Sequence, residues 1–392
     1  MKKFLIVTVI IIVLQASFNS VEAQSITGSN VVATAVPFLL IAPDSRGAAL
    51  GETGVATSPD INSQFWNQAK YPFVNQKMGA SLTYTPWMRS VVSDMNFSTL
   101  SGFLRISNYG SLSSSMRYLS YGSLPDYNTQ GILQSYQRPK EFAFDVGYST
   151  KFSRFCSGGV ALRYILSDMA RGEVDGIILN PAKSFAADVS FYYSKTIKNG
   201  FHHKTWSLGA VLSNIGSPIS YNDGLTKNYL PANLRIGGGF SFSLDRFNEI
   251  NLSVDLCKLM VPSTTYTSQT NSDGELVVTL DDDAQRGVFG SMIQSFSDAP
   301  GGFAEELQEI NAGIGAEYVY NKVFAIRTGF FNENENKGAR KYASAGVGIV
   351  LYSFSFDLSY LYSLKVSPLE NTMRFTVSFD FSEWFKNSNI KR

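Results

Sequence analysis

A strict alternation of apolar and polar side chains constrains this chain more than any other feature. The segment 373–381 reads Met-Arg-Phe-Thr-Val-Ser-Phe-Asp-Phe, and the segments 354–360, 250–256 and 142–148 repeat the pattern. Successive side chains of a β-strand point to opposite faces, whereas a helix would scatter them around its circumference. The alternation recurs from residue 79 to residue 381. The sequence therefore predicts an all-β fold.

The alternating segments predict fourteen strands. Most are longer than the five or six residues typical of soluble strands, and they suit the ~9 to 11 residues that cross a bilayer at a tilt. An even strand number with one apolar face is typical of a transmembrane antiparallel β-barrel, which we expect over 78–381. The expected strands are 79–87, 94–106, 111–121, 141–152, 157–167, 184–195, 204–216, 232–243, 248–260, 307–320, 323–332, 341–352, 354–364 and 372–381.

The strand ends and the connections fit the same fold. Aromatic pairs near strand ends predict interfacial girdles: Tyr84 and Trp87, Tyr118 and Tyr121, Tyr192 and Tyr193, Tyr318 and Tyr320, and Tyr360 and Tyr362. Short connections, such as 153–156, 195–204 and 321–322, alternate with longer ones. Short turns face the periplasm in this class, so we expect long loops outside and both termini on the periplasmic side.

The N-terminus predicts export. Lys2 and Lys3, an apolar stretch and a small-residue site ending at Ala23 are typical of a signal peptide over 1–23, with the mature chain starting at Gln24. Charged residues make up only 17%, against about 25% in ordinary globular chains, and the net charge of +1 argues against nucleic acid as a partner. The segment 382–392 is expected to be a periplasmic tail.

The segment 24–77 lacks the alternation and precedes the first strand. It combines the apolar stretch 36–41 with Gly- and Ala-rich sequence. It holds too many apolar residues to remain a solvated tail, so it could fold into the lumen as a plug or cap the periplasmic mouth.

Candidate catalytic and metal-binding residues are few. His202 and His203, in an expected short turn, would point opposite ways on a strand and cannot share a metal there. The run 281–283 consists of aspartates and could hold a cation, but it lacks the spacing of a calcium loop, which favours a solvated run. Gly237–Gly239 lies within a strand without a phosphate-binding fingerprint. Two distant cysteines, Cys156 and Cys257, are expected to stay unpaired. We expect no enzyme activity, no metal and no cofactor.

The long loop 261–306 contains one further candidate site. Its apolar side chains recur at helical spacing, which predicts an amphipathic helix with one apolar face. That face could fold back over the barrel mouth, or it could dock a partner protein. The candidate partner-binding residues are Phe289, Met292, Ile293 and Phe296.

The plug segment carries a resemblance to a known family. The spacing D-x-R-x-x-x-x-G-x-x-G, followed by W-N-x-A, resembles the PorV (LptO) family, within the FadL-like superfamily of fourteen-stranded barrels with an N-terminal plug. PorQ-type barrels share these elements, and the stretch 36–41 favours PorV. Gln68 departs from the pattern, since relatives often have Pro there. The matching plug residues are Asp44, Arg46, Gly51, Gly54, Trp66 and Asn67.

The resemblance implies a function without catalysis. PorV-like barrels are outer-membrane components of the type IX secretion system. They associate with the SprA (Sov) translocon barrel, bind the C-terminal signal domain of cargo, and pass it to the attachment complex that contains PorU. The alternative is a FadL-like transporter of hydrophobic small molecules, which would need an apolar lumen pocket and a lateral opening, for which the strand at Gly237–Gly239 is a candidate.

Overall fold

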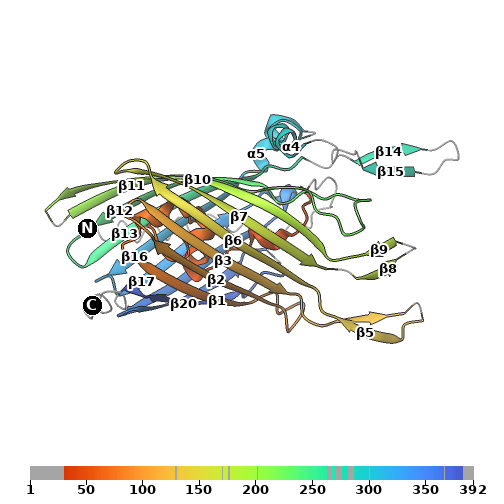
Figure 1. Ribbon diagram of the computed structural model, residues 1–392, viewed down its shortest axis with the longest axis horizontal. Coiled ribbons are helices and arrows are strands. Elements are labelled where there is room, and N and C mark those ends of the chain that lie inside the picture. The colour runs from red at the N-terminus through yellow and green to blue at the C-terminus, as the bar shows by residue number, and fades with distance from the viewer. Residues whose placement is uncertain are drawn as a thin grey trace.

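The computed structural model describes most of the chain. It covers residues 31–128, 130–169, 171–174, 177–200, 202–262, 266–270, 276–280, 287–299, 301–365 and 367–382. The expected signal peptide, the aspartate run 281–283 and the tail after residue 382 lie outside these residues. Within them, fourteen antiparallel strands close into a single barrel (Figure 1). The predicted fold class is confirmed.

Each barrel strand pairs with the next barrel strand along the chain, and β20 returns to pair with β1, so the barrel sheet has no free edge. All fourteen expected strands are present, with bounds within four residues of those expected. They are β1 (Met78–Pro86), β2 (Asn96–Arg105), β3 (Gly110–Ser120), β6 (Lys140–Lys151), β7 (Cys156–Asp168), β10 (Ala182–Asn199), β11 (His202–Gly216), β12 (Asn233–Ser243), β13 (Asn248–Leu259), β16 (Asn311–Tyr320), β17 (Phe324–Asn332), β18 (Lys341–Leu351), β19 (Phe354–Ser363) and β20 (Met373–Asp380).

The alternation sorts side chains between the outer wall and the lumen. In β20, Met373, Phe375 and Val377 are exposed on the outer wall, whereas Arg374 and Thr376 are buried inside. The outer face is therefore apolar and the lumen is lined by polar groups, as the sequence predicted for a barrel in lipid.

The aromatic girdle is only partly as expected. Tyr84 and Tyr118 are exposed on the outer wall, as are Tyr318, Tyr320 and Tyr362. Trp87 and Tyr192, however, are buried inside, and Tyr121 packs against the interior cluster at the loop end. Adjacent residues such as Tyr192 and Tyr193 must face opposite sides of a strand, so both could not belong to a girdle.

The two ends of the barrel differ in their connections. Short turns, the start of β1 and the end of β20 lie at one end, and long excursions lie at the other (Figure 1). These excursions contain three hairpins that the alternation did not predict, β4 (Leu124–Tyr127) with β5 (Leu133–Gln137), β8 (Gly172–Val174) with β9 (Ile177–Leu179), and β14 (Tyr266–Thr270) with β15 (Leu276–Leu280). They also contain α4 (Val288–Gln294), α5 (Phe303–Gln308) and η4 (Glu335–Lys337). No helix in the part of the chain that is described is long and apolar enough to span a bilayer.

Three expected strand bounds differ in ways that change other predictions. β10 runs on to Asn199 and β11 begins at His202, so the two histidines lie on a strand rather than in the expected turn. The strand expected from residue 307 begins at Asn311, because α5 occupies the preceding residues.

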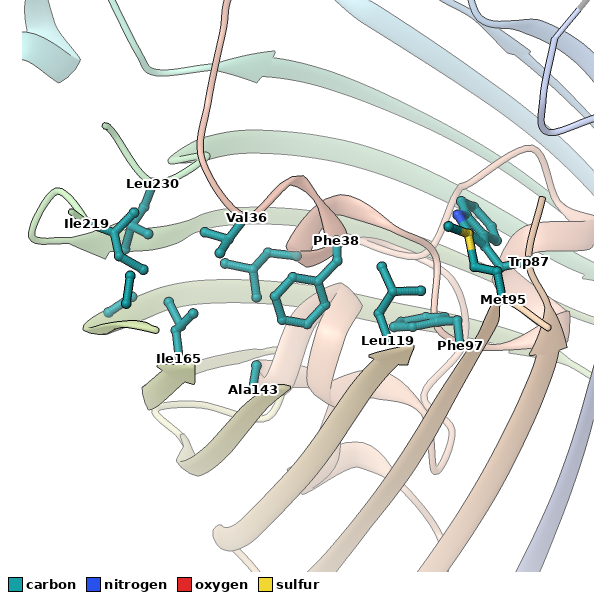
Figure 2. Packing of buried hydrophobic residues seen from close by; sticks show 13 residues of the cluster. Val36, Phe38, Trp87, Met95, Phe97, Leu119, Ala143, Ile165, Ile219 and Leu230 are labelled. Carbon is teal, nitrogen blue, oxygen red and sulfur yellow. The ribbon is translucent and has the colours of Figure 1, made fainter. Parts of the chain in front are cut away.

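The segment before β1 fills the lumen. This plug (31–77) contains η1 (Pro37–Leu40), α2 (Ser45–Ala49), α3 (Ser63–Asn67) and η2 (Gln68–Phe73). At the long-loop end, Val36, Phe38 and Leu39 pack against wall and loop residues that include Leu119 (Figure 2). At the turn end, Tyr71 stacks on Phe103 with ring centroids 5.0 Å apart. The plug therefore traverses the barrel and does not simply cap the periplasmic mouth.

The plug enters from the long-loop end. The amide of Ala35 donates to the carbonyl of Tyr229, which lies on the excursion between β11 and β12, and Val32 packs near Met260 and Met292. The first described residues therefore lie at the mouth opposite the short turns.

Candidate functional site

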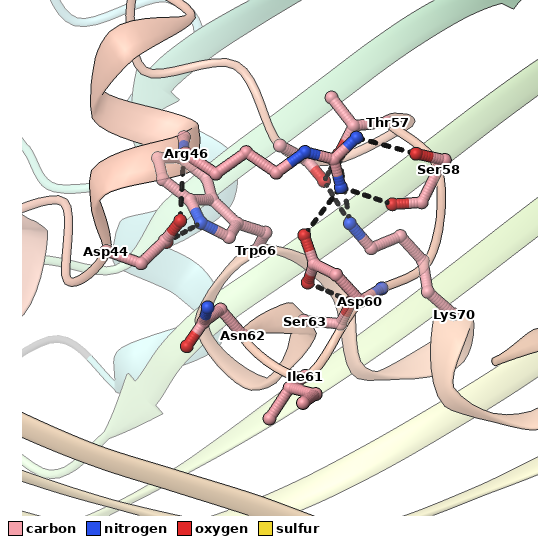
Figure 3. A network of polar contacts seen from close by, with 12 residues as sticks. Asp44, Arg46, Thr57, Ser58, Asp60, Ile61, Asn62, Ser63, Trp66 and Lys70 are labelled. Carbon is pink, nitrogen blue, oxygen red and sulfur yellow. Dashed lines mark hydrogen bonds and ion pairs between the residues drawn. The ribbon is translucent and has the colours of Figure 1, made fainter. Parts of the chain in front are cut away.

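Three of the six plug residues singled out in the sequence, Asp44, Gly54 and Trp66, contact one another, and Figure 3 shows Asp44 and Trp66 together with Arg46. Asp44 is the N-cap of α2, and its Oδ2 accepts from the amide of Gly47 at 2.9 Å. Its Oδ1 accepts from Nε1 of Trp66 at 2.6 Å. The indole covers Gly47 and Gly54 so closely that a Cβ at Gly54 would lie 2.2 Å from the ring. Glycine is required at positions 47 and 54 because the indole occupies the space that a side chain would fill.

Arg46 joins the plug to the barrel wall. Its Nε and Nη2 donate to Oε1 and Oε2 of Glu317 on β16 at 3.0 and 2.9 Å, and Nη1 donates to Asp60 at 2.7 Å. Nη1 and Nη2 also bond Ser58. A planar guanidinium with several donors suits this kind of bidentate contact, which lysine could not reproduce.

Burial changes the pKa values of charged groups within the plug. Desolvation, with repulsion from Asp60, raises the pKa of Asp44 to about 6. Desolvation acts in the same direction on Asp60, but Lys70 and Arg46 outweigh it and lower the pKa of this carboxyl. Desolvation lowers the pKa of Lys70, whose Nζ donates to the carbonyl of Gly54 at 2.8 Å and to Thr57 at 3.1 Å.

Gly51 allows the plug backbone to touch the wall. Its φ is +67°, and a Cβ there would lie 2.6 Å from the backbone of Phe330. Lumen-facing glycines of the wall, Gly313 and Gly329, meet Gly51 from the other side. Because these positions have no side chains, the backbone of the plug lies directly against the backbone of the wall. The sequence signal for it was the spacing of small residues at lumen-facing positions.

Asn67 and side chains of the wall form hydrogen bonds with further backbone groups of the plug. Nδ2 of Asn67 donates to the carbonyls of Val55 at 3.0 Å and Phe191 at 2.9 Å, and Oδ1 caps η2 by accepting from Ala69. On β13, Oδ2 of Asp255 accepts from the amides of Gly54 and Val55 at 2.7 and 2.9 Å. Gln68, the departure from the family pattern, is fully buried beside these contacts.

A ladder of buried charges on the wall was missed by sequence reasoning. Asp145 of β6 pairs with Arg117 of β3 and with Arg163 of β7, and Arg163 also pairs with Asp188 of β10 at 2.7 Å. Nη1 of Arg117 donates to the carbonyl of Leu39 in the plug at 3.1 Å. The alternation of faces along each strand could have shown that these residues point into the lumen. It could not have shown which residues they pair with.

The plug and these charges leave little free space inside the barrel. A cavity of about 160 Å³ lies toward the turn end beside Arg46 and His203. Smaller cavities of about 30 and 10 Å³ lie beside Arg235. Charged side chains such as Arg46, Glu317 and Arg235 line these cavities, so they do not form the continuous apolar passage that a hydrocarbon would need.

The excursion between β13 and β16 builds a platform at the long-loop end, which we define as residues 287–308. Of the four expected docking residues, Met292 is buried with Ala232, Met260 and Val261. Phe289 and Ile293 are 70% and 74% exposed, and Phe296 is half exposed. Met292, together with Val288, therefore anchors α4 on the barrel rim, while Phe289 and Ile293 face outward.

Ion pairs hold the second helix of the platform. Lys258 on β13 pairs with Glu306 at 2.9 Å and with Glu309. Lys337 in η4 pairs with Glu305 at 2.6 Å and with Glu309 at 3.0 Å. Phe303, at the start of α5, is 77% exposed. The platform is thus fixed to the rim while its large apolar side chains face solvent.

The histidines, the cysteines and the glycine run considered in the sequence form no catalytic or metal site among the described residues. Nε2 of His203 lies 3.4 Å from Glu249, and His202 contacts the carbonyl of Ser243. Cys156 and Cys257 are both free thiols. Among the described residues no group of three His, Cys, Asp or Glu side chains could hold a metal. Gly237–Gly239 lies in β12, which pairs with β11 and β13 over its whole length without a register shift. The lateral opening that the transporter alternative would need is not seen at this strand.

Comparison with known proteins identifies a family whose model matches this chain. The model of the PorV family, "Type IX secretion system protein PorV", matches residues 24–266, more than half of the chain. No protein of curated function matches the sequence.

Solved structures that resemble the barrel share little sequence with it. The toluene transporter TbuX of Ralstonia pickettii is 10% identical, with 86% of this chain and 96% of that chain covered, at a TM-score of 0.45. The toluene transporter TodX of P. putida is 9% identical, with 85% and 96% covered, at 0.48. A FadL homologue of Pseudomonas aeruginosa is 9% identical, with 91% and 100% covered, at 0.42.

Proposed function

The chain belongs to the PorV family of type IX secretion proteins, and on that premise we propose that it is a docking component and not a pore. In this proposal the barrel binds the C-terminal signal domain of cargo at a SprA-like translocon barrel. It then passes the cargo to the attachment complex that contains PorU. The short turns face the periplasm and the platform lies at the cell surface. No catalytic step is assigned to the chain.

The observation that carries the proposal is the platform. Phe289, Ile293 and Phe303 are large, apolar and exposed, although each lies on an element anchored to the barrel rim. Exposed apolar side chains on a fixed support are typical of protein-binding surfaces. A preformed surface also loses less conformational entropy on binding than a mobile loop would.

The alternative, a transporter of hydrophobic small molecules, has less support. Such a route requires a continuous apolar passage, whereas the plug and buried ion pairs occupy the lumen, and charged side chains such as Arg46 and Glu317 line its cavity of about 160 Å³. β12 also remains paired on both sides.

The proposal is tested by charging the platform. Phe289→Asp combined with Ile293→Asp should abolish recovery of the translocon barrel and of cargo signal domains from a detergent extract. It should also stop display of cargo on the cell surface. Leu225→Asp is the matched control, because Leu225 is 77% exposed on a different long excursion. Recovery of the partners at the wild-type level by the platform variant would refute docking through this surface.

A further inference from the structure

The outer wall carries an apolar groove that no part of the proposed function uses. Its volume is about 620 Å³, and it crosses β11, β12, β13, β16 and β17. Two neighbouring cross-strand rows line it. One runs from Trp206 through Phe240 and Leu252 to Ala316 and Thr328, and the other runs from Leu208 through Gly238, Val254 and Ile314 to Phe330.

Small residues form the floor of the groove. Gly238, Ala316 and Thr328 lie among large side chains such as Phe240 and Ile314. The lining includes no ionisable side chain. On a wall that faces hydrocarbon, such a depression must be filled by an apolar group, since an empty one would forfeit dispersion contacts.

The barrel itself does not require glycine at position 238. A Cβ there would meet only Val254 at 3.7 Å and Leu208 at 3.9 Å, which are ordinary contacts. The neighbours differ: a Cβ at Gly237 would lie 2.2 Å from Asp255, and one at Gly239 would lie 2.5 Å from the carbonyl oxygen of Ala56. The inward glycines make room for the plug, whereas the outward one leaves room for something outside the barrel.

The groove is bounded by positive charge at its β11 edge. Lys195 of β10 pairs directly opposite Trp206 and is exposed. Lys204 lies two residues before Trp206 on the same outer face of β11, about 7 Å away along the strand, and is also exposed. Both lysines lie toward the short turns, where interfacial residues meet lipid headgroups.

We propose that the groove binds one phospholipid with an anionic headgroup. An acyl chain lies over Gly238 and Ala316, and the phosphate lies against Lys195 and Lys204. Such a lipid has an apolar chain that matches the groove and a negative charge that matches the two lysines at the β11 edge of the groove. A neighbouring barrel would instead leave both ammonium groups at a protein contact, where unpaired charges are costly.

The test is native mass spectrometry of the purified barrel in detergent with palmitoyl-oleoyl phosphatidylglycerol. The wild-type barrel should retain one lipid through detergent exchange, and Gly238→Leu, which fills the groove, should lose it. Gly102→Leu is the matched control, because Gly102 also faces outward and a Cβ there meets only ordinary contacts of 3.4 and 3.9 Å. Both leucine variants should keep the heat-modifiable gel mobility of a folded barrel.

The headgroup is tested separately. Lys195→Gln with Lys204→Gln should remove the preference for phosphatidylglycerol over phosphatidylcholine, whereas Lys183→Gln, at the other end of β10, should not. Equal lipid retention by Gly238→Leu and Gly102→Leu would overturn the proposal. So would loss of a second barrel copy, in place of a lipid, in Gly238→Leu, and so would an unchanged headgroup preference in the lysine variant.

Discussion

Arg46 of the plug and Glu317 of β16 form a bidentate ion pair with N–O distances of 3.0 and 2.9 Å. The same carboxylate accepts from Arg327 of β17 at 2.7 Å, and Arg327 donates onward to Asp357 of β19 at 2.6 Å. Glu317 is only 3% exposed. The pair therefore links the plug to three strands of the wall, β16, β17 and β19, and its loss should affect more than local packing.

Glu317→Gln should destabilise the folded barrel strongly. The change removes the charge shared by two buried guanidinium groups, and breaking a buried pair from one side costs about 3 to 5 kcal/mol. Urea unfolding in detergent, followed by tryptophan fluorescence, should show a lower midpoint. Glu249→Gln is the control, because Glu249 makes a partly exposed contact with His203 and its loss should cost less than about 1 kcal/mol. Equal midpoints for the two variants would contradict the role given to Glu317.

Gly54→Ala should impair folding, because the added methyl group would overlap the ring of Trp66. The overlap is with a buried indole held by Asp44, so neither group can move away easily. Overpacking of this kind typically costs about 1 to 3 kcal/mol. The yield of heat-modifiable barrel should fall. It should recover in part when Trp66→Leu is added, although Trp66→Leu alone should also lower stability. A double variant no better than Gly54→Ala would place the strain elsewhere.

The alternation of apolar and polar residues predicted the strands well, because one face of each strand contacts lipid and the other faces the polar lumen. A residue such as Phe375 faces lipid and its neighbour Thr376 faces the lumen, so parity alone assigns each face. The same parity, applied strictly, would have placed Tyr192 inside and Tyr193 outside. The plug motif was also legible, since Asp44, Gly54 and Trp66 form one contact unit within a short stretch of chain.

Partners across the lumen were not predictable in the same way. Arg163 joins Asp145 and Asp188 because the barrel closes with a particular stagger and the plug occupies the centre, and neither is encoded locally. In the platform, helical spacing predicted a helix that includes Phe289, Met292 and Ile293, which lie on α4, whereas Phe296 lies beyond its end. Spacing alone could not show that Met292 anchors the helix while Ile293 faces solvent, because that depends on where the barrel rim lies.

The start of the plug should be accessible from the long-loop side. Val31 is half exposed at the mouth where Ala35 bonds Tyr229. Val31→Cys, in a background without Cys156 and Cys257, should react with a membrane-impermeant maleimide in intact cells. Leu225→Cys, on a long excursion, should react similarly, and Phe152→Cys, exposed beside a short turn, should react only after the membrane is opened. Labelling of Phe152→Cys and not of Val31→Cys in intact cells would reverse this topology.

The ion pairs of Lys258 and Lys337 should determine how rigid the platform is. Lys258→Met with Lys337→Met leaves Glu305, Glu306 and Glu309 without these two ammonium groups, so α5 should open locally more often. Amide hydrogen exchange over Phe303–Gln308 should accelerate about tenfold or more, which corresponds to at least about 1.4 kcal/mol of local stability. Exchange in the barrel strands should not change.

The same double variant shows whether docking depends on the rigidity of the platform or only on its exposed apolar side chains. Lys365→Met is the control, because it removes an exposed pair with Glu335 and should leave exchange in α5 unaltered. The exposed Phe289 and Phe303 remain in the double variant, yet partner recovery should fall, since a partner must now order the platform on binding. Faster exchange with undiminished partner recovery would mean that a preformed platform is not needed for docking. Unchanged exchange would mean that the apolar contacts of Met292 hold the platform without the ion pairs.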